Sequence, residues 1–211
     1  MPETPRLLLF FVATLILLLT PGPAVLYIVA RSVDQGRVAG LVSVLSIEAG
    51  NFVHVLAATF GLSALLMSSA LAFSAVKYLG AAYLIYLGIR KLLTKPLPLQ
   101  EQTVAPQSLR RIFTQGVLVA VLNPKTALFF LAFLPQFVDS SRGPVARQML
   151  LLGCIFVLMA LVSDSLYALL ADSLGQWVRR SPAFLRGERY VVGGVYLGLG
   201  ITAALAGPPR H

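Results

Sequence analysis

The sequence predicts an all-α integral membrane protein with six transmembrane helices in two inverted three-helix repeats, whose first and fourth helices are broken by proline. The first observation is composition: the chain is 57% hydrophobic and 12% charged, with a mean hydropathy of +0.83, whereas soluble domains carry about 25% charged residues. The second is length, since 211 residues leave room for about six bilayer-spanning runs and no soluble domain. The third is a pair of proline breaks, about half the chain apart.

We treat residues 1–211 as a single transmembrane domain. The first repeat, about 7–93, is predicted to contain a broken span, a short polar turn and two further spans, at 7–30, Arg31–Arg37 and 38–93 respectively. A cleaved signal peptide is the alternative interpretation of the first run. Such a peptide needs a positive start and a small-residue cleavage site, but Glu3 and Arg6 cancel and no Ala-x-Ala follows.

The second repeat covers about 111–206 and follows a proline-rich polar segment at 94–110, which we expect to be a mobile cytoplasmic linker. It is predicted to contain three spans, at about 112–138, 146–174 and 190–206. Polar turns separate them at Asp139–Pro144 and Arg179–Arg189. The repeats also resemble each other, because Lys77–Ile89 aligns with Arg189–Ile201 at an offset of 112. Three spans is an odd number, so the second repeat enters the membrane from the opposite side.

Two breaks carry the functional argument, Thr20-Pro21-Gly22-Pro23 and Asn123-Pro124-Lys125. Proline removes a helical hydrogen bond, and in lipid the freed backbone groups need partners from the protein or from a wet cavity. Pro21 and Pro124 lie 103 residues apart, so we treat them as corresponding positions of the two repeats. We expect the breaks to face each other across a transport site. The alternative is that these prolines only kink helices for packing.

A site between two such breaks suits a zwitterion. A half-helix that begins at a proline directs free N–H groups and the positive end of its dipole at the cavity, which attracts a carboxylate. Unwound carbonyl groups, together with Glu48 or Asp164, are candidates to hold an ammonium group. Much of the predicted binding is therefore done by the backbone, and the residues of the breaks matter for its shape.

Ionisable residues inside predicted spans are functional candidates, because they are costly in lipid. In the second span Glu48, Asn51 and His54 recur every third residue, so they share one broad helical face, which we expect to look inward. A carboxyl group held away from water is suited to bind and release a proton. Asp164 lies near the middle of the fifth span, the counterpart of the second. The alternative for each carboxylate is a structural ion pair, and Lys125 is the candidate partner of Asp164.

The net charge of +9 indicates membrane orientation rather than nucleic-acid binding, because the basic residues lie in short loops between apolar runs. Eleven Lys and Arg residues fall on one predicted side and four on the other. The positive-inside rule then places the first side in the cytoplasm and both termini outside, in the periplasm. The one cysteine, Cys154, excludes an internal disulfide.

Two parts of the sequence resemble the LysE/RhtB family of amino-acid exporters. One is the first break with its spacing to Gly36-Arg37-x-x-Gly40-Leu41, and the other is the stretch from Leu122-Asn123-Pro124-Lys125 through Leu134-Pro135-Gln136-Phe137. The likeness covers nearly the whole chain. It implies a multi-pass protein of the bacterial inner membrane that expels amino acids or similar small metabolites with the proton gradient. The substrate and homo-oligomer formation stay open. One departure is Glu48, where we expect a small apolar residue, and it raises altered coupling or an unusual substrate as hypotheses.

Two other classes of function were weighed against a transporter of amino acids. An intramembrane enzyme needs a nucleophile with a base or a metal cluster, and the sequence has neither Gly-x-Ser-x-Gly nor His-Glu-x-x-His. We therefore expect neither enzymatic activity nor a cofactor. A channel or metal-ion exporter of related architecture would use inward carboxylates, and Glu48, Asp164 and Asp172 are its candidates.

Overall fold

The computed structural model describes residues 4–62 and 107–171, with scattered helical positions between 75 and 93 and between 190 and 205. Within this part the chain forms helices and turns without a strand, so the predicted all-α class is confirmed. Most of the two aligned segments, most of the predicted linker and the basic loop 179–189 lie outside the described residues. The six-span count and the inverted three-helix repeat therefore stay predictions.

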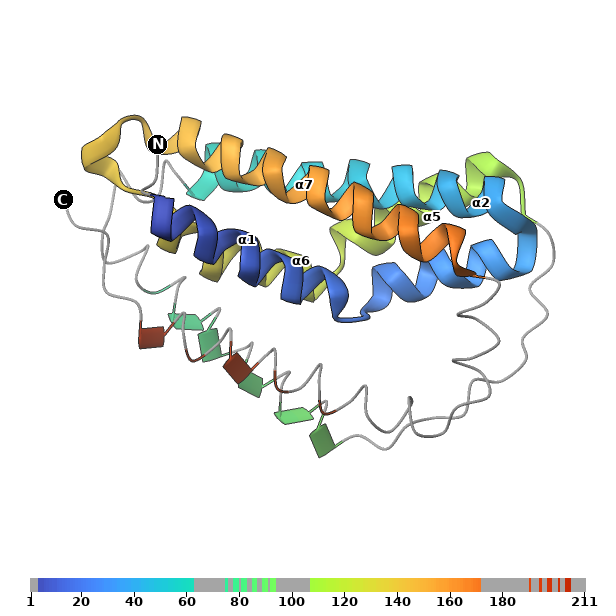
Figure 1. The fold of residues 1–211 in the computed structure, drawn as a ribbon, viewed down its shortest axis with the longest axis horizontal. Helices are drawn as coiled ribbons and strands as arrows, with labels where there is room; N and C mark the ends of the chain where they lie inside the picture. The colour runs from blue at the N-terminus through green and yellow to red at the C-terminus, as the bar shows by residue number, and fades with distance from the viewer. Residues whose placement is uncertain are drawn as a thin grey trace.

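The first apolar run folds as a broken helix (Figure 1). Helix α1, Thr4–Leu19, and the first half of α2, Pro23–Leu56, run in the same direction, and residues 20–22 link them without helical structure. Pro21 and Pro23 have no N–H group to donate to the carbonyls one turn back, so the α1 helix cannot continue through them. The break lies where the sequence predicts it.

Helix α2 reverses its direction at Gly36, where the backbone takes φ 79° and ψ −178°. Only glycine adopts this region readily, because it carries no Cβ. Residues 37–56 then run back, and a π-helical turn, η1 (Ala57–Leu62), extends them. The predicted polar turn at Arg31–Arg37 is too long, since the structure keeps the residues before Gly36 helical and reverses the chain at this single glycine.

The fourth span is also broken. Helix α5 (Leu109–Val121) and helix α6 (Pro124–Leu128) are separated by two residues, and the two helical parts are bent by 42°. Beyond α6 the helix continues as a π-helical turn, η2 (Phe129–Phe133), and a 3₁₀ turn, η3 (Leu134–Phe137). Pro135 has no N–H for a longer helical bond, which accounts for the tighter turn that contains it.

The start of α5 lies slightly before the predicted residue 112. Ser108 is its N-cap, and the Ser108 hydroxyl accepts a hydrogen bond from the Arg111 N–H at 3.4 Å. A serine in this position satisfies an N–H group that the helix itself leaves free. The end of the predicted linker is thus an ordered helix start rather than a mobile loop.

A well-bonded turn joins the fourth and fifth spans. It holds one 3₁₀ turn, η4 (Ser140–Arg142), and leads into α7 (Val145–Leu169). The buried Gln148 amide donates to the Asp139 carbonyl at 2.7 Å, and the Asp139 N–H donates back to the Gln148 side chain at 3.1 Å. The turn predicted at Asp139–Pro144 is confirmed.

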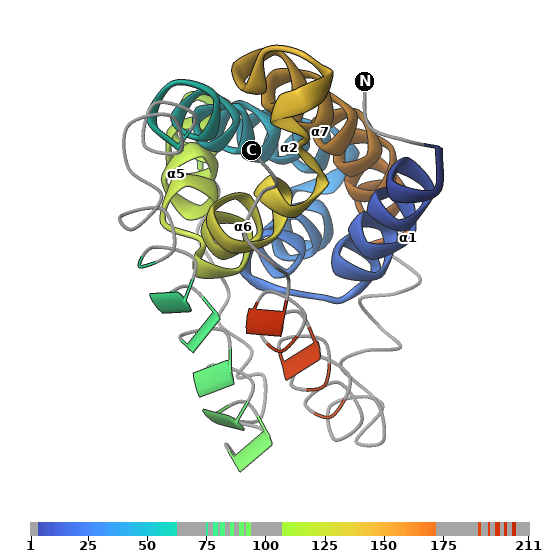
Figure 2. The same cartoon turned by 90° about the vertical axis from the view of Figure 1, so that its left-hand side faces the viewer.

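The two broken helices run in opposite directions. In Figure 1 the chain passes from α1 into α2 one way and from α5 into α6 the other way, and the second half of α2 and α7 are likewise opposed. Helix α2 packs mainly against α5 and α7. The end view of Figure 2 shows α5, α2, α7 and α1 in an arc around α6. This opposed arrangement is the one that an inverted repeat gives to its first two spans.

A glycine lets α2 and α5 approach closely. A Cβ atom at Gly50 would lie 2.8 Å from the Val117 carbonyl oxygen and would also collide with the Ala120 side chain. Small residues at helix contacts are typical of membrane proteins, because apolar burial gives little driving force between helices in lipid. The close contact leaves the neighbouring Glu48 and Asn51 buried in the interior.

Phenylalanine side chains form the centre of the core. The Phe129 ring lies 5.0 Å from Phe156 and 5.3 Å from Phe133, measured between ring centroids. Phe10 of α1 lies 5.3 Å from Phe137. Edge and tilted contacts of this kind add to the free energy gained from burial. The cluster fixes η2 and η3 between α1 and α7, and so positions the helix that follows the second break.

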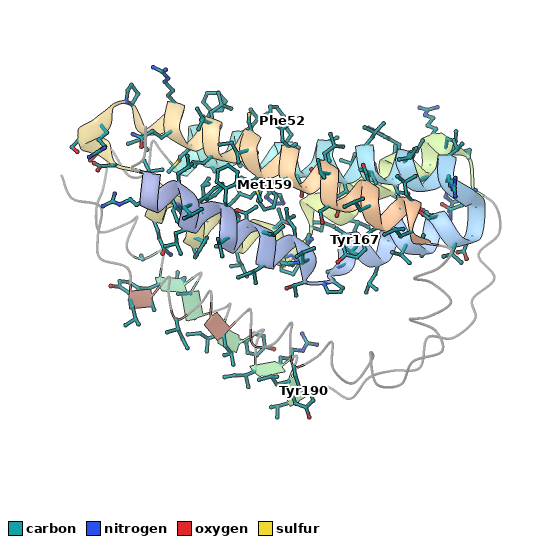
Figure 3. The ribbon with its side chains drawn as sticks, in the orientation of Figure 1. Phe52, Met159, Tyr167 and Tyr190 are labelled. Carbon is teal, nitrogen blue, oxygen red and sulfur yellow. The ribbon has the colours of Figure 1, made fainter. Side chains whose placement is uncertain are left out.

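Large apolar side chains cover the outer faces of the described helices (Figure 3). Leu8, Leu158 and Val162 are 65%, 62% and 64% exposed. By length and composition, two helical stretches of the described residues could cross a membrane, Pro23–Gly61 and Val145–Leu169, and the bent pair of α5 with α6 to η3 makes a third. Extended exposed apolar surface marks a surface that contacts a membrane or another protein.

Candidate functional site

The first break leaves backbone groups open. The Thr20 hydroxyl donates to the Ile16 carbonyl at 2.6 Å, and the Thr20 carbonyl lies past the end of α1. Gly22 is the N-cap of α2, Pro23 occupies its first position, and no side chain caps this helix start. The first N–H groups of α2 are therefore available to a ligand.

At the second break, the start of helix α6 is capped by the side chain of Asn123. The Asn123 side-chain oxygen accepts a hydrogen bond from the Lys125 N–H at 3.1 Å, and Pro124 is the first residue of α6. The breaks thus correspond as Gly22-Pro23 and Asn123-Pro124, each an N-cap followed by a proline where its missing N–H is harmless. The prediction that Pro21 corresponds to Pro124 is wrong, because Pro21 lies in the link before the N-cap.

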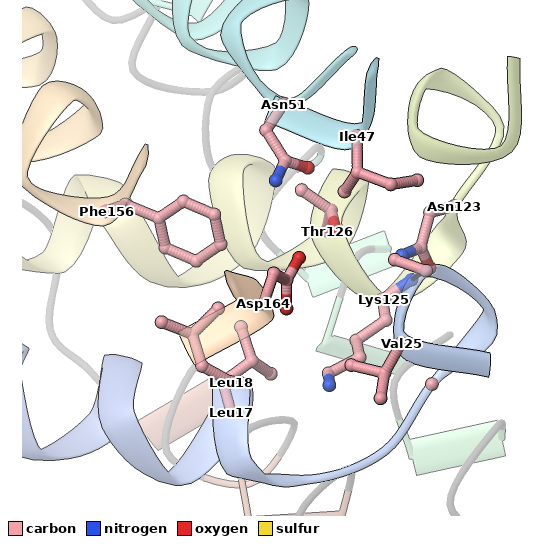
Figure 4. A pocket seen from close by; sticks show the side chains of 12 residues that line it. Leu17, Leu18, Val25, Ile47, Asn51, Asn123, Lys125, Thr126, Phe156 and Asp164 are labelled. Atoms are coloured by element: carbon pink, nitrogen blue, oxygen red, sulfur yellow. Dashed lines mark hydrogen bonds between the residues drawn. The ribbon is translucent and has the colours of Figure 1, made fainter. Parts of the chain in front are cut away.

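The two breaks meet through Lys125 (Figure 4). Its side chain is buried and runs past Gly22, and its Nζ donates a hydrogen bond to the Thr20 carbonyl, 105 residues away in the sequence. The carbonyl at the end of one half-helix is therefore bonded by a side chain from the start of another. The structure brings the predicted break residues together, while their role in binding stays a prediction.

Two buried carboxyl groups lie beside this contact. Asp164 of α7 is 4% exposed and interacts electrostatically with Lys125. Glu48 of α2 is 6% exposed, and its carboxyl group interacts electrostatically with Asp164. When one of the two carboxyl groups is protonated, the cluster of Lys125, Glu48 and Asp164 carries no net charge.

Lys125 and Asp164, both within the described residues, make no direct ion pair. In this conformation the salt bridge between the fourth and fifth spans is not formed, although the two groups interact electrostatically. The lysine ammonium bonds a backbone carbonyl of the first break instead, so it links the fourth span to the first.

Several polar atoms around the cluster lack partners. The Asn51 amide donates to Glu48 at 3.1 Å, but Asn51 Oδ1, Glu48 Oε1 and Ser163 Oγ are buried without a hydrogen bond. Buried polar atoms are nearly always paired, so orphaned atoms beside a cavity indicate a place for a proton, a water molecule or a ligand. His54, predicted on the same inward face, is turned to α5, where its ring lies 3.1 Å from the Ala120 carbonyl.

A small cavity lies between the two breaks and α7. Its volume is about 30 Å³, which is room for roughly two water molecules. It is lined by residues of both breaks, α1, α2, α6 and α7, namely Leu17, Leu18, Gly22, Ala24, Val25, Ile47, Asn51, Asn123, Lys125, Thr126, Phe156 and Asp164. An amino acid does not fit in this volume, so this conformation has no room for a substrate beside Lys125.

The lining differs in part from the predicted site. Glu48 does not line the cavity, but it is hydrogen-bonded to Asn51 and interacts electrostatically with Asp164, and both of these residues do line it. Thr126 and Phe156 line it without having been predicted. The sequence gives no signal for either, because one follows Lys125 in an apolar run and the other is an ordinary aromatic residue of the fifth span.

Contacts on either side of the cavity join the first broken span to its neighbours. At one end Arg6 lies 3.5 Å from Asp139, between α1 and the turn before α7. At the other end the Gln35 amide donates to the Gln107 carbonyl at 2.8 Å and accepts from the Gln107 N–H at 3.0 Å. Nearby, the Tyr27 hydroxyl donates to the α5 backbone at 2.6 Å. The first broken span is thus tied by polar contacts at both of its ends.

In the part of the chain that the structure describes, no group of three or more His, Cys, Asp and Glu side chains could hold a metal ion. Asp172, a candidate for the ion-exporter alternative, lies outside the described residues.

Comparison with known proteins identifies the family. The sequence profile of the family described as LysE type translocator matches residues 15–207, which include both breaks, Glu48 and Asp164. The chain belongs to the LysE-type translocator family. It is therefore a membrane transporter for small molecules, as the resemblance of its breaks indicated. No solved structure matches it.

Relatives of this LysE-type translocator match it along nearly its whole length. An uncharacterized membrane protein of Vibrio cholerae is 30% identical over 200 residues, covering 94% of this chain and 96% of that protein. Another, of Pseudomonas aeruginosa, is 30% identical over 202 residues, covering 93% and 94%. A homoserine/homoserine lactone efflux protein of Salmonella typhimurium is 28% identical over 202 residues, covering 96% of each chain.

Proposed function

We propose that this translocator exports amino acids or related small metabolites from the bacterial cytoplasm in exchange for protons. The observation that carries the proposal is the hydrogen bond from Lys125 to the Thr20 carbonyl, which joins two helix breaks beside the buried Asp164. A relative named for homoserine and homoserine lactone efflux supports both the outward direction and the size of the substrate.

The proposed architecture has six spans in two inverted three-helix repeats, embedded in the inner membrane with both termini in the periplasm. The opposed directions of the two broken helices support the inversion. The excess of Lys and Arg on one predicted side supports the orientation. In this arrangement the cavity lies at the interface of the repeats, near the middle of the membrane.

In the proposed binding mode, the two breaks hold opposite ends of a zwitterion. The substrate carboxylate lies at the uncapped start of α2, where Ala24 and Val25 line the cavity and the helix dipole favours an anion. The substrate ammonium lies between the Thr20 carbonyl and the Asp164 carboxylate. The second break offers no free helix start, because Asn123 caps it.

Proton exchange follows from the pair of carboxyl groups. Glu48 and Asp164 are both buried and interact electrostatically, and two ionised carboxylates in the interior would repel each other. A substrate ammonium group is attracted by the ionised form of Asp164 and not by its protonated form. Substrate and proton then compete for one site, which is the requirement for coupled exchange.

Uptake into inside-out membrane vesicles tests the proposal. Vesicles containing the protein should accumulate labelled homoserine or another amino acid when the lumen is acidic, and a protonophore should abolish the accumulation. A parallel panel of divalent metal ions provides the comparison with the ion-exporter alternative. Accumulation of a metal ion and of no amino acid would overturn the proposal.

A further inference from the structure

Lys125 holds the position that a substrate ammonium group would take. Its Nζ donates to the Thr20 carbonyl and interacts electrostatically with Asp164. These are the two groups to which the proposed function assigns the substrate amine. The side chain of lysine itself ends in a primary ammonium group, a compact charge with three donors. The protein thus places a chemical equivalent of the amine of its substrate in its own site.

The lysine side chain also fills the space. A Cβ atom at Gly22 would lie 3.2 Å from Lys125 Cδ and 3.6 Å from Lys125 Nζ, so the side chain packs directly on the first break. Only about 30 Å³ of the cavity is left beside it. No second ammonium group fits at the Thr20 carbonyl while Lys125 remains there.

The second break directs this side chain while leaving it free to move. Asn123 fixes the Lys125 backbone N–H, and Pro124 fixes the first turn of α6. Beyond Cα the side chain is a flexible four-carbon stem. The ammonium can therefore leave the Thr20 carbonyl by rotation of the stem, without movement of the helix that carries it.

We propose that Lys125 is a tethered ammonium that occupies the substrate amine position in the empty translocator and is displaced towards the substrate carboxylate when the substrate binds. The inference rests on the proposed function and adds a rule of selectivity. A zwitterion supplies both an amine for the vacated position and a carboxylate for the displaced lysine. A simple amine supplies only the first, so Lys125 rejects it. The empty site also keeps a cation beside Asp164.

Truncation of the side chain tests this assignment. Lys125→Ala removes the atoms from Cγ to Nζ, which together correspond to n-propylammonium. Purified Lys125→Ala protein should bind propylammonium about tenfold or more tightly than wild type, seen as a concentration-dependent rise in its melting temperature. Propionate, of similar size and opposite charge, should give no such rise. Met149→Ala, which opens a cavity in the apolar core of α7, should not prefer propylammonium.

Lys125→Ser provides the same test if the alanine variant does not fold. If neither variant folds alone, propylammonium in the growth medium should restore its accumulation in the membrane and propionate should not. Equal effects of propylammonium and propionate, or equal effects on wild type and variant, would overturn the inference. Binding of propylammonium by the variant, without transport of any amino acid by wild type, would keep the inference about Lys125 and contradict the proposed function.

Discussion

Gly22 and Asn123 occupy the same position in two helices that run in opposite directions. Each is an N-cap residue, and each is followed by a proline at the first helical position. Their chemistry differs, because Asn123 caps its helix with its own side chain whereas Gly22 has none to offer. The helix start at Gly22 therefore has N–H groups available to a ligand. The helix start at Asn123 has its Lys125 N–H already bonded, and it contributes the Lys125 side chain to the site.

The double substitution Pro21→Ala with Pro23→Ala, and separately Pro124→Ala, should impair transport while preserving the fold. Each variant restores N–H groups and permits the preceding helix to continue through the break, where an interior proline costs up to roughly 3 kcal/mol relative to alanine. The melting temperature should hold or rise, and flux per folded molecule should fall in both variants. Pro144→Ala, at the exposed start of α7, is the control. If the prolines only serve packing, the melting temperature will fall and flux per folded molecule will be retained.

Gly36→Ala should destabilise the protein. The backbone at this position takes φ 79° and ψ −178°, and holding a residue with a side chain there costs about 1–3 kcal/mol. The nearest atoms lie more than 4 Å from an added Cβ, so the effect arises from the backbone rather than from a clash. Gly61→Ala, also in open space but in helical geometry, is the matched control. Equal unfolding temperatures for the two variants would contradict this account of the reversal.

Asp139 should stabilise the turn before α7 in a pH-dependent way. The hydrogen bond from the Ser141 side chain, followed by the Ser141 N–H and the nearby Arg6 and Arg142, lowers the pKa of this carboxyl group below its ordinary value of 3.8. A lowered pKa in the folded state means that the stabilisation is present above pH 3.8 and is lost as the pH falls through the folded-state value.

The melting temperature of wild type should therefore exceed that of Asp139→Asn at neutral pH, and the two should converge below about pH 4. Asp34→Asn, at the opposite end of the described helices, is a control for the general effect of acid. A difference that is unchanged between neutral and acidic pH would show that the charge of Asp139 does not stabilise the turn.

The two breaks could be predicted from sequence because proline and glycine interrupt a helix wherever they stand in an apolar run. Which proline occupies the first helical position could not be predicted. It depends on where α1 ends, and α1 ends at Leu19, so Pro21 falls in the link and Pro23 begins the next helix. The predicted correspondence of Pro21 and Pro124 failed for this reason.

The partner of Lys125 was missed for a related reason. Counting charges pairs a buried lysine with the nearest buried carboxylate, and that reasoning selects Asp164. A backbone carbonyl group that a helix break leaves without a partner can also accept a hydrogen bond from a lysine ammonium group. This acceptor can be recognised only once the structure shows where the Thr20 carbonyl lies. The electrostatic interaction of Glu48 with Asp164 likewise depends on how α2 packs against α5 and α7. That packing cannot be predicted from the sequence of one span.

Gradient-driven accumulation by Asp164→Asn tests the central claim most directly. The variant keeps the shape of the side chain and removes its charge from the buried cluster. In inside-out vesicles with an acidic lumen, wild type and the exposed control Asp34→Asn should accumulate labelled substrate. Asp164→Asn, at equal abundance in the membrane, should lose gradient-driven accumulation, because the amide cannot bind and release a proton and does not attract an ammonium group. Accumulation by Asp164→Asn equal to wild type, with an unchanged pH profile, would contradict the account.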